Sequence, residues 1–411
     1  MNILYVVNDF FPLFYGGVER YVLNISKQMQ RMGHGVKVLT YGMDGKNSGY
    51  YRRGDILVKQ YIYENVPVIS VRHIEIPPDI GYRIFDDLLE RNLHALLEHE
   101  KIEILHIAHP MKFSPIVDVA KQMRVPVVLA LTDFWLLCPR GRFYKPDYTP
   151  CNSPVNGKKC IQECGIDSSV LERYKKAEDI FYSIDRIIAP SRFIIKVFEN
   201  NGWKKEITLV RHGFEYTCVK RVNKPGREDG SVVFGYTGLL TKFKGVDLLI
   251  ESFKRVKNDK LSLLIYGDVY NEWVWERAFN HNITRSAKTD KRIRFMGKYT
   301  HDDLSKIFNT IDINIVPSTT LESYGLVVTE SLSHNVPVIV SDVVGSAYEY
   351  VIDGVNGFVF PVDNPESLTE IIERIANNPP IIDRLRQNIV LPPRIEEEAF
   401  MLEGIYKELT H

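Results

Sequence analysis

The chain has 411 residues, more than one hydrophobic core usually organises, so two domains are expected. Lysine plus arginine and aspartate plus glutamate both number 52, and this zero formal charge argues against a nucleic-acid-binding protein, which normally carries a basic excess. There is no basic leader with a cleavage site and no apolar stretch near bilayer length. We therefore expect a cytoplasmic protein, with room for peripheral contact with the inner face of the membrane.

The first 218 residues alternate short apolar runs with segments at helical spacing. Ile3–Val7 is predicted to be a buried strand, and apolar residues from Val18 to Met29 follow on one helix face. Further strands are expected at 36–40, 68–71, 104–107, 127–131 and 186–189, and helices between them include 83–99 and 116–122. This alternation predicts a parallel sheet with helices on both faces.

A loop rich in proline and glycine, residues 138–164, holds Cys138, Cys151, Cys160 and Cys164. Four thiols in one irregular loop can close a tetrahedral zinc site, and a metal would order a loop that has little core of its own. The spacing lacks tightly paired C-x2-C units, so free thiols and an iron–sulfur cluster stay open as alternatives. The pattern favours structural zinc slightly over free thiols, and a reducing compartment argues against disulfides.

A polar stretch at 219–230 is the best linker candidate, and the alternation of strand and helix then resumes. Strands are expected at 231–236, 261–266, 293–296, 313–316 and 338–341, with helices at 246–257, 302–309, 325–334 and 367–377. The sequence therefore predicts an α/β protein with two doubly wound, Rossmann-like domains, 1–218 and 219–390, facing a central cleft. A C-terminal helical segment, 391–411, has room to pack back on the first domain.

Residues 316–332, VPSTTLESYGLVVTESL, predict a ligand site at the end of a strand. A helix is expected to begin near Gly325, and its first free amides, around Leu326 and Val327, can bind an anion. Glu322 lies at the mouth of this site. Glu330 lies in the second helical turn, where a pair of ribose hydroxyls would satisfy its two oxygens. Either glutamate alone is more simply explained as a structural or surface residue, whereas the full arrangement is more specific.

This arrangement resembles the E-x7-E motif of the retaining glycosyltransferases of family four, which have the GT-B architecture. The segments 235–253 and 342–360 also look like that family's sequence, as do the amino-terminal segment 8–40 and the acceptor-side segment 108–143. The resemblance covers nearly the whole chain. It implies a hexosyltransferase that uses a nucleotide-sugar donor, UDP- or GDP-linked, in cell-surface glycan or glycolipid synthesis.

By resemblance, Glu322 contacts the donor sugar and Glu330 the ribose, while Lys244 neutralises the diphosphate as a mobile point charge. Gly16 and Gly17 are implied to form a loop over the phosphates. Taken singly, a lysine in a turn or two adjacent glycines are weak signals, and there is no G-x-G-x-x-G fingerprint.

Two positions depart from the family pattern. After Gly238 the family often has an arginine, where this chain has Leu239; Lys242 or Arg192 are candidates to compensate. The family's His-Asp-Phe is here Thr132-Asp133-Phe134, so a histidine expected near the donor is missing.

The expected chemistry needs no catalytic metal, because fixed donors aimed at the departing diphosphate lower the barrier. Glu322, Lys244 and His109 are the catalytic candidates, with His109 on the acceptor side. The acceptor is expected to be a glycan, a lipid-linked group or a small molecule, and no nucleic acid is involved. A non-catalytic nucleotide-sugar-binding protein and a nucleotide-sugar epimerase are the alternatives.

Overall fold

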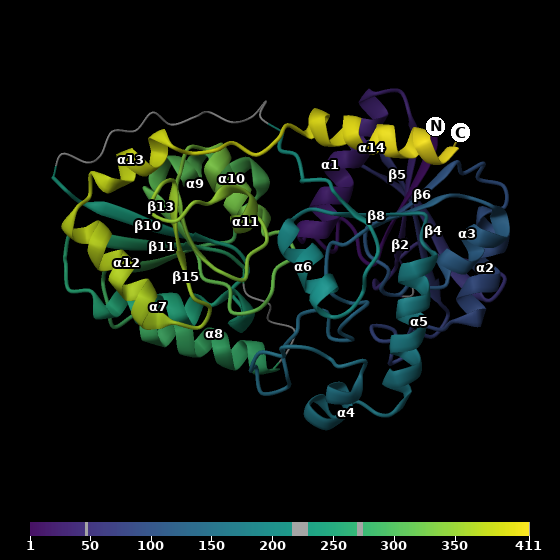
Figure 1. Cartoon of the computed structure of the whole chain (residues 1–411), viewed down its shortest axis with the longest axis horizontal. Coiled ribbons are helices and arrows are strands. Elements are labelled where there is room, and N and C mark those ends of the chain that lie inside the picture. Colours follow the sequence, from purple (N-terminus) through teal and green to yellow (C-terminus); the bar gives the residue numbers. More distant parts are fainter. Residues whose placement is uncertain (46–47, 216–228, 269–273, 411) are drawn as a thin grey trace. The chain divides into compact units, whose positions relative to one another are not determined.

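The computed structural model describes residues 1–45, 48–215, 229–268 and 274–410. The chain divides into two compact units: unit 1 is Met1–Gly213 with Ile395–His411, and unit 2 is Phe214–Arg394 (Figure 1). The expected boundary between residues 218 and 219 lies outside the described residues.

Unit 1 is built on a nine-stranded sheet with the order β3-β4-β5-β2-β1-β6-β7-β8-β9. The pairs β3–β4 and β4–β5 are antiparallel and all the others are parallel. Its strands are β1 (Asn2–Val7), β2 (Gly35–Tyr41), β3 (Tyr51–Arg53), β4 (Ile56–Tyr63), β5 (Val66–His73), β6 (Ile104–Ile107), β7 (Val127–Ala130), β8 (Arg186–Ala189) and β9 (Ile207–Leu209). Its helices are α1 (Gly17–Arg31), α2 (Asp87–Leu97), α3 (Ile116–Met123), α4 (Lys158–Cys164), α5 (Ser169–Ser183), α6 (Arg192–Asn200) and α14 (Ile395–Thr410).

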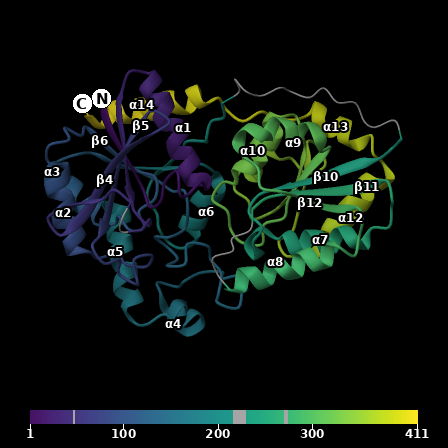
Figure 2. The ribbon, with the colours of Figure 1, turned by 180° about the vertical axis from the view of Figure 1, so that it is seen from behind.

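The C-terminal helix α14 packs beside α1 on one face of this sheet, as both ribbon views show (Figures 1 and 2). A buried polar chain reinforces the packing: the Tyr406 hydroxyl lies 2.6 Å from Nδ1 of His106, whose Nε2 lies 3.1 Å from the Tyr21 hydroxyl. Burial lowers the pKa of His106 to about 3, so its ring stays neutral. A neutral histidine ring with both nitrogens hydrogen-bonded can be buried at little cost in free energy.

Unit 2 is built on a six-stranded parallel sheet with the order β12-β11-β10-β13-β14-β15. Numbered from β10, this is the 3-2-1-4-5-6 order of Rossmann sheets, which places the switch point between β10 and β13. Its strands are β10 (Val232–Thr237), β11 (Leu261–Tyr266), β12 (Ile293–Gly297), β13 (Ile313–Val316), β14 (Val338–Ser341) and β15 (Gly357–Phe360). Its helices are η2 (Lys242–Lys244), α7 (Val246–Arg255), α8 (Val274–Ala287), η3 (His301–Asp303), α9 (Leu304–Thr310), α10 (Leu326–Ser333), α11 (Ala347–Tyr350), α12 (Pro365–Asn377) and α13 (Ile381–Gln387).

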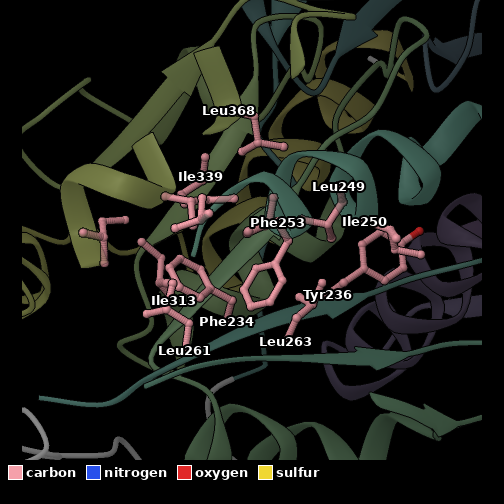
Figure 3. Close-up of a cluster of buried hydrophobic side chains, with 14 of the residues drawn as sticks. Phe234, Tyr236, Leu249, Ile250, Phe253, Leu261, Leu263, Ile313, Ile339 and Leu368 are labelled. Carbon is pink, nitrogen blue, oxygen red and sulfur yellow. The ribbon is translucent and has the colours of Figure 1, made fainter. Parts of the chain in front are cut away.

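The core of unit 2 lies between the sheet and α7 and α12. Phe234, Leu263 and Ile339 from the strands meet Phe253 of α7 and Leu368 of α12 (Figure 3). All five are fully buried or nearly so. Burial of side chains of this size contributes roughly 1.5–3 kcal/mol each, so the core fixes the strand ends that carry the site.

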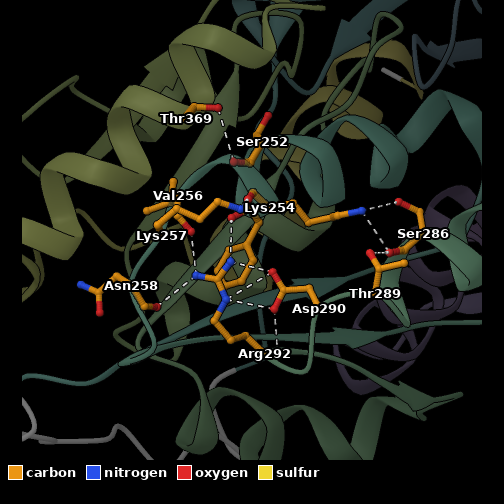
Figure 4. A network of polar contacts seen from close by, with 11 residues as sticks. Ser252, Lys254, Val256, Lys257, Asn258, Ser286, Thr289, Asp290, Arg292 and Thr369 are labelled. Carbon is orange, nitrogen blue, oxygen red and sulfur yellow. Dashed lines mark hydrogen bonds and ion pairs between the residues drawn. The ribbon is translucent and has the colours of Figure 1, made fainter.

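One partly buried arginine secures the outer edge of this core. Arg292 forms a paired contact with Asp290 and donates to the carbonyls of Val256 and Asn258, just past the end of α7 (Figure 4). A cation at the C-terminal end of a helix is favourable because the unpaired carbonyls there carry partial negative charge. The contact ties α7 to the start of β12.

Candidate active site

The switch point of unit 2 carries the loop that leads into α10. Gly325 precedes the helix in a left-handed conformation with φ of +88°, and a Cβ added there would lie 2.6 Å from Cγ1 of Val344. Only glycine fits both constraints without strain. The first turn of α10, which the structure describes in full, holds no acidic residue, so its partial positive charge is not offset from within the helix.

Glu322 is held in place by the backbone and by two side chains. Its N–H donates to the carbonyl of Val343, and its own carbonyl accepts from Gly345. Its carboxylate forms an ion pair with Lys244 at 2.8 Å and accepts a hydrogen bond from the Ser318 hydroxyl. The structure thus brings two of the three catalytic candidates together, and it adds Ser318, which the sequence analysis did not single out.

The turn that carries Lys244 approaches this loop closely. The N–H of Thr319 donates to the carbonyl of Phe243, and a Cβ on Gly245 would overlap with the carbonyl oxygen of Pro317. Lys242, the other lysine of the turn, forms an ion pair with Asp247 instead. The turn therefore directs Lys244, rather than Lys242, toward Glu322.

Glu330 lies in the second turn of α10 and is half-buried, and Leu326 and Val327 are also half-buried. Its charge acts on Tyr299, whose pKa is raised first by burial and then by Glu330. Tyr299 is hydrogen-bonded to Thr237, at the end of β10. Tyr299 follows β12 and carries no motif, so sequence reasoning had no signal for it.

Asn314 extends this polar chain into the sheet. Its Nδ2 donates to the Thr237 hydroxyl at 3.3 Å, and its Oδ1 is buried without a partner among the described residues. Gly238, the next residue after β10, donates its N–H to the carbonyl of Tyr266 and closely approaches Gly267. The polar residues Thr237, Tyr299 and Glu330 thus line the same strand ends as the switch point.

In unit 1, the Gly16–Gly17 turn opens α1 but already contacts a carboxylate. Glu19, in the first helical turn, accepts a hydrogen bond from the Gly16 backbone, and its Oε2 lies 2.6 Å from where a Cβ on Gly16 would stand. Glu19 is only 9% exposed. Burial raises the pKa of Glu19 to about 7, and the charge of Asp9 adds to the rise. The absent side chain of Gly16 therefore gives Glu19 room to reach back to the start of its own helix.

His109, at the end of β6, forms a close pair with Asp133. Its Nε2 lies 2.6 Å from Oδ2 of Asp133, and its Nδ1 accepts the N–H of Met111 at 3.1 Å. Thr132, in the position of the expected histidine, donates its hydroxyl to the carbonyl of Ala108. Arg192, the remaining donor-binding candidate, is the first residue of α6 in unit 1.

Within the described residues, the structure does not show the zinc site predicted for the cysteine loop. Cys138 and Cys160 are buried and Cys151 and Cys164 are half-buried, and all four are free thiols. The thiols are near enough to raise one another's pKa, with burial the larger cause. However, among the described residues no three histidine, cysteine or acidic side chains are placed to hold a metal ion.

The cysteine loop has other means of support. Phe143 is 3% exposed and meets Phe134 edge-on at 5.5 Å. Lys145 and Glu163 form an ion pair at 3.0 Å across the loop. The loop therefore has packing and an ion pair of its own, so a metal is not its only means of support.

Within the described residues, no helix is both long and apolar enough to cross a bilayer. Two Rossmann-like units in one chain, the second carrying Glu322, Gly325 and Glu330 at its switch point, define the GT-B class of glycosyltransferase.

Comparison with known proteins identifies the family. Residues 220–390 match the model of the glycosyl transferases group 1, and residues 15–216 match that of glycosyltransferase family 4. The chain belongs to the group 1, family 4 glycosyltransferases and is a glycosyltransferase enzyme.

Three similar proteins are two relatives in sequence and one solved structure of the same fold. An uncharacterized glycosyltransferase of Methanocaldococcus jannaschii is 24% identical over 398 residues, which cover 92% of this chain and 90% of the relative. The lipopolysaccharide 1,2-N-acetylglucosaminetransferase of Salmonella typhimurium is 27% identical over 215 residues, which cover 50% and 55%. The Anabaena protein HepE, solved in complex with UDP and glucose, has a TM-score of 0.67 at 17% identity and covers 100% and 98%.

Proposed function

We propose that this glycosyltransferase moves a hexose from a UDP- or GDP-sugar to a hydroxyl acceptor, with retention of configuration at the anomeric carbon. The observation that carries the proposal is the Lys244–Glu322 ion pair, 2.8 Å long, beside the start of α10. A lysine and free helix amides at one strand end are suited to a diphosphate. A carboxylate paired with that lysine is suited to the hydroxyls of the attached sugar.

The charge that develops on the departing diphosphate is the main problem of the reaction. Lys244 and the first amides of α10 oppose that charge, and fixed donors of this kind replace the solvent that would otherwise stabilise it. We therefore propose a reaction that needs no divalent metal. Gly16 and Gly17, with Gly238, are proposed as further donor contacts, and Lys242 and Arg192 as secondary cations.

Glu330 is proposed to bind the ribose. It is half-buried beside Tyr299 and Thr237, where two hydroxyl donors would complete a polar chain. That chain includes the Oδ1 of Asn314, which has no partner in the part of the chain that the structure describes. A hydrogen bond to a charged group contributes about 1.5–3 kcal/mol. Loss of the carboxylate should therefore weaken nucleotide binding by roughly ten- to hundredfold.

The acceptor side is proposed to lie in unit 1, at His109. The Salmonella relative acts on lipopolysaccharide, which supports a cell-surface glycan or glycolipid as the product. We place the enzyme in the cytoplasm, with peripheral membrane contact where the acceptor is lipid-linked. Reducing conditions there would keep the four thiols of the cysteine loop free.

The test is a panel of nucleotides and nucleotide sugars, screened by thermal shift and then by calorimetry, because a ligand that binds only the folded chain raises its melting temperature. Glu330→Ala should lose nucleotide affinity, whereas Glu322→Ala should lose turnover more than affinity. Glu373→Ala, an exposed glutamate on α12, is the control. Unchanged affinity in Glu330→Ala would contradict the ribose assignment. Binding without transfer or donor hydrolysis would instead favour a nucleotide-sugar-binding protein.

A further inference from the structure

The His109–Asp133 pair has a fixed orientation that makes Asp133 the outward partner. Because Nδ1 of His109 accepts the Met111 N–H, the ring proton must be on Nε2, which donates to Oδ2 of Asp133. Both ring nitrogens are thus occupied. The side chain of His109 is 8% exposed and that of Asp133 is 24% exposed. The carboxylate, rather than the imidazole, is the group of this pair that a ligand can reach.

His109, Trp135 and Arg173 together fix the position of the Asp133 carboxylate. Its Oδ1 accepts the N–H of Trp135 at 3.1 Å, and the carbonyl of Trp135 accepts from Nη2 of the buried Arg173. Arg173 also attracts the Asp133 charge directly. A Cβ on Gly141 would lie 3.4 Å from Oδ2, so the absent side chain leaves space at that oxygen.

Within the described part of the chain, one hydrogen bond reaches each carboxylate oxygen of Asp133. A carboxylate offers about four lone-pair directions, so the group retains capacity for a ligand. An ionised acceptor of this kind binds hydroxyl donors well and repels phosphate and carboxylate groups. The site therefore selects a neutral, hydroxyl-bearing acceptor.

We propose that Asp133 recognises a second hydroxyl of the acceptor, next to the one that attacks, and that His109 is a positioning residue that aims Asp133. The proposal rests on the proposed function. In the retaining reaction the acceptor oxygen bonds to the anomeric carbon, the bond from that carbon to the donor phosphate oxygen breaks, and the hydroxyl proton leaves with the departing phosphate. The attacking hydroxyl has one proton, so a hydrogen bond to Asp133 has to come from its neighbour. The acceptor class is a vicinal diol, as in a sugar ring or a polyol.

The test compares two small alcohols that differ by one hydroxyl, 1,2-propanediol and 1-propanol, as acceptors with the donor that the panel identifies. Water competes with each alcohol for the same enzyme–donor complex. The ratio of alkyl glycoside to free sugar is therefore independent of donor affinity and of the folded fraction. The parent chain should favour the diol over 1-propanol by about tenfold, the effect of one charge-assisted hydrogen bond.

Asp133→Asn should abolish this preference while it still consumes donor in water. Asp118→Asn is the matched control, because Asp118 has a side chain 29% exposed and is paired with Lys176 on the same unit. His109→Gln should reduce the preference in part. Imidazole ¹⁵N spectra should show the Nε2–H form of His109 in the parent and a mixture of tautomers in Asp133→Asn.

Two results would overturn the proposal: a parent chain that does not distinguish the two alcohols, or an Asp133→Asn variant that keeps the parent's preference. Failure of the proposed function looks different, because the parent would then consume no donor either with alcohol or in water alone.

Discussion

The buried carboxyl group of Glu19 should make the stability of unit 1 depend on pH. Burial, reinforced by Asp9, raises the pKa of Glu19 from 4.5 to about 7. Because the folded pKa is the higher one, the unfolded chain releases this proton first, and the free energy of unfolding falls as the pH rises from about 4.5 to about 7. The full difference corresponds to about 3 kcal/mol, most of which is lost between pH 5 and pH 8.

Glu19→Gln removes the charge but keeps the shape and one acceptor oxygen. Relative to the parent, the unfolding free energy of the variant should therefore rise by about 2–3 kcal/mol between pH 5 and pH 8. Urea unfolding, followed by the hydrogen exchange of peptides from β1 and β6, reports on unit 1 alone. Glu172→Gln, an exposed glutamate in the first turn of α5, is the control for loss of one surface carboxylate. The reasoning is refuted if the difference in unfolding free energy between the variant and the parent changes by less than about 0.5 kcal/mol between pH 5 and pH 8, or changes in the opposite direction.

Two further predictions concern the η2 turn and the cysteine loop. Gly245 and Gly354 have nearly equal φ, +67° and +70°, but a Cβ on Gly245 would overlap with the Pro317 carbonyl, whereas one on Gly354 would meet nothing within 4 Å. In urea unfolding, Gly354→Ala should lower the free energy of unfolding by about 1–2 kcal/mol, and Gly245→Ala should lower it clearly more. Only Gly245→Ala should also lose turnover. Equal losses of stability in the two variants would contradict this prediction. Protein purified without chelator should hold less than half an equivalent of metal, as measured by metal analysis. A full equivalent of zinc would instead support a zinc site in loop 138–164.

Most buried parallel strands could be predicted from the sequence, because they are short apolar runs bounded by turns. Leu261–Tyr266 and Ile313–Val316 match the predicted strands, and their alternation with helices predicts the Rossmann-like domains. The GT-B class was implied by the family resemblance. The antiparallel strand β4, Ile56–Tyr63, was missed because Lys59 and Gln60 interrupt its apolar residues and, of its side chains, only Ile56 and Val58 are buried. A continuous apolar run therefore identifies a strand only where both faces of the sheet are covered.

The segment that carries the site could be predicted from the sequence, but the pairs of side chains that contact one another in the site could not. Glu322, Gly325 and Glu330 are close in sequence, so one strand–loop–helix reading brings them together. The choice between Lys242 and Lys244 depends on how a turn approaches Pro317, which no local pattern encodes. Asp133 was noted only as part of a departure from the family pattern, and its link to His109 depends on the neighbouring ends of β6 and β7.

The helices α1 and α10 are each preceded by a glycine, but they differ in whether their own first turn holds an acidic residue. In α10 the first turn is free of acidic residues, whereas in α1 the Glu19 carboxyl already accepts the Gly16 N–H. A phosphate can therefore approach Gly16 and Gly17 most readily when Glu19 carries a proton.

If these glycines contact the donor, affinity should fall by up to about tenfold between pH 6 and pH 8 in the parent, as Glu19 ionises. UDP-glucose is the appropriate probe because its phosphate diesters do not titrate in that range. Glu19→Gln should bind it equally well at both pH values, as measured by calorimetry. A parent affinity that does not change with pH would show that the phosphates depend on Lys244 and α10, and that the glycines serve only to accommodate Glu19.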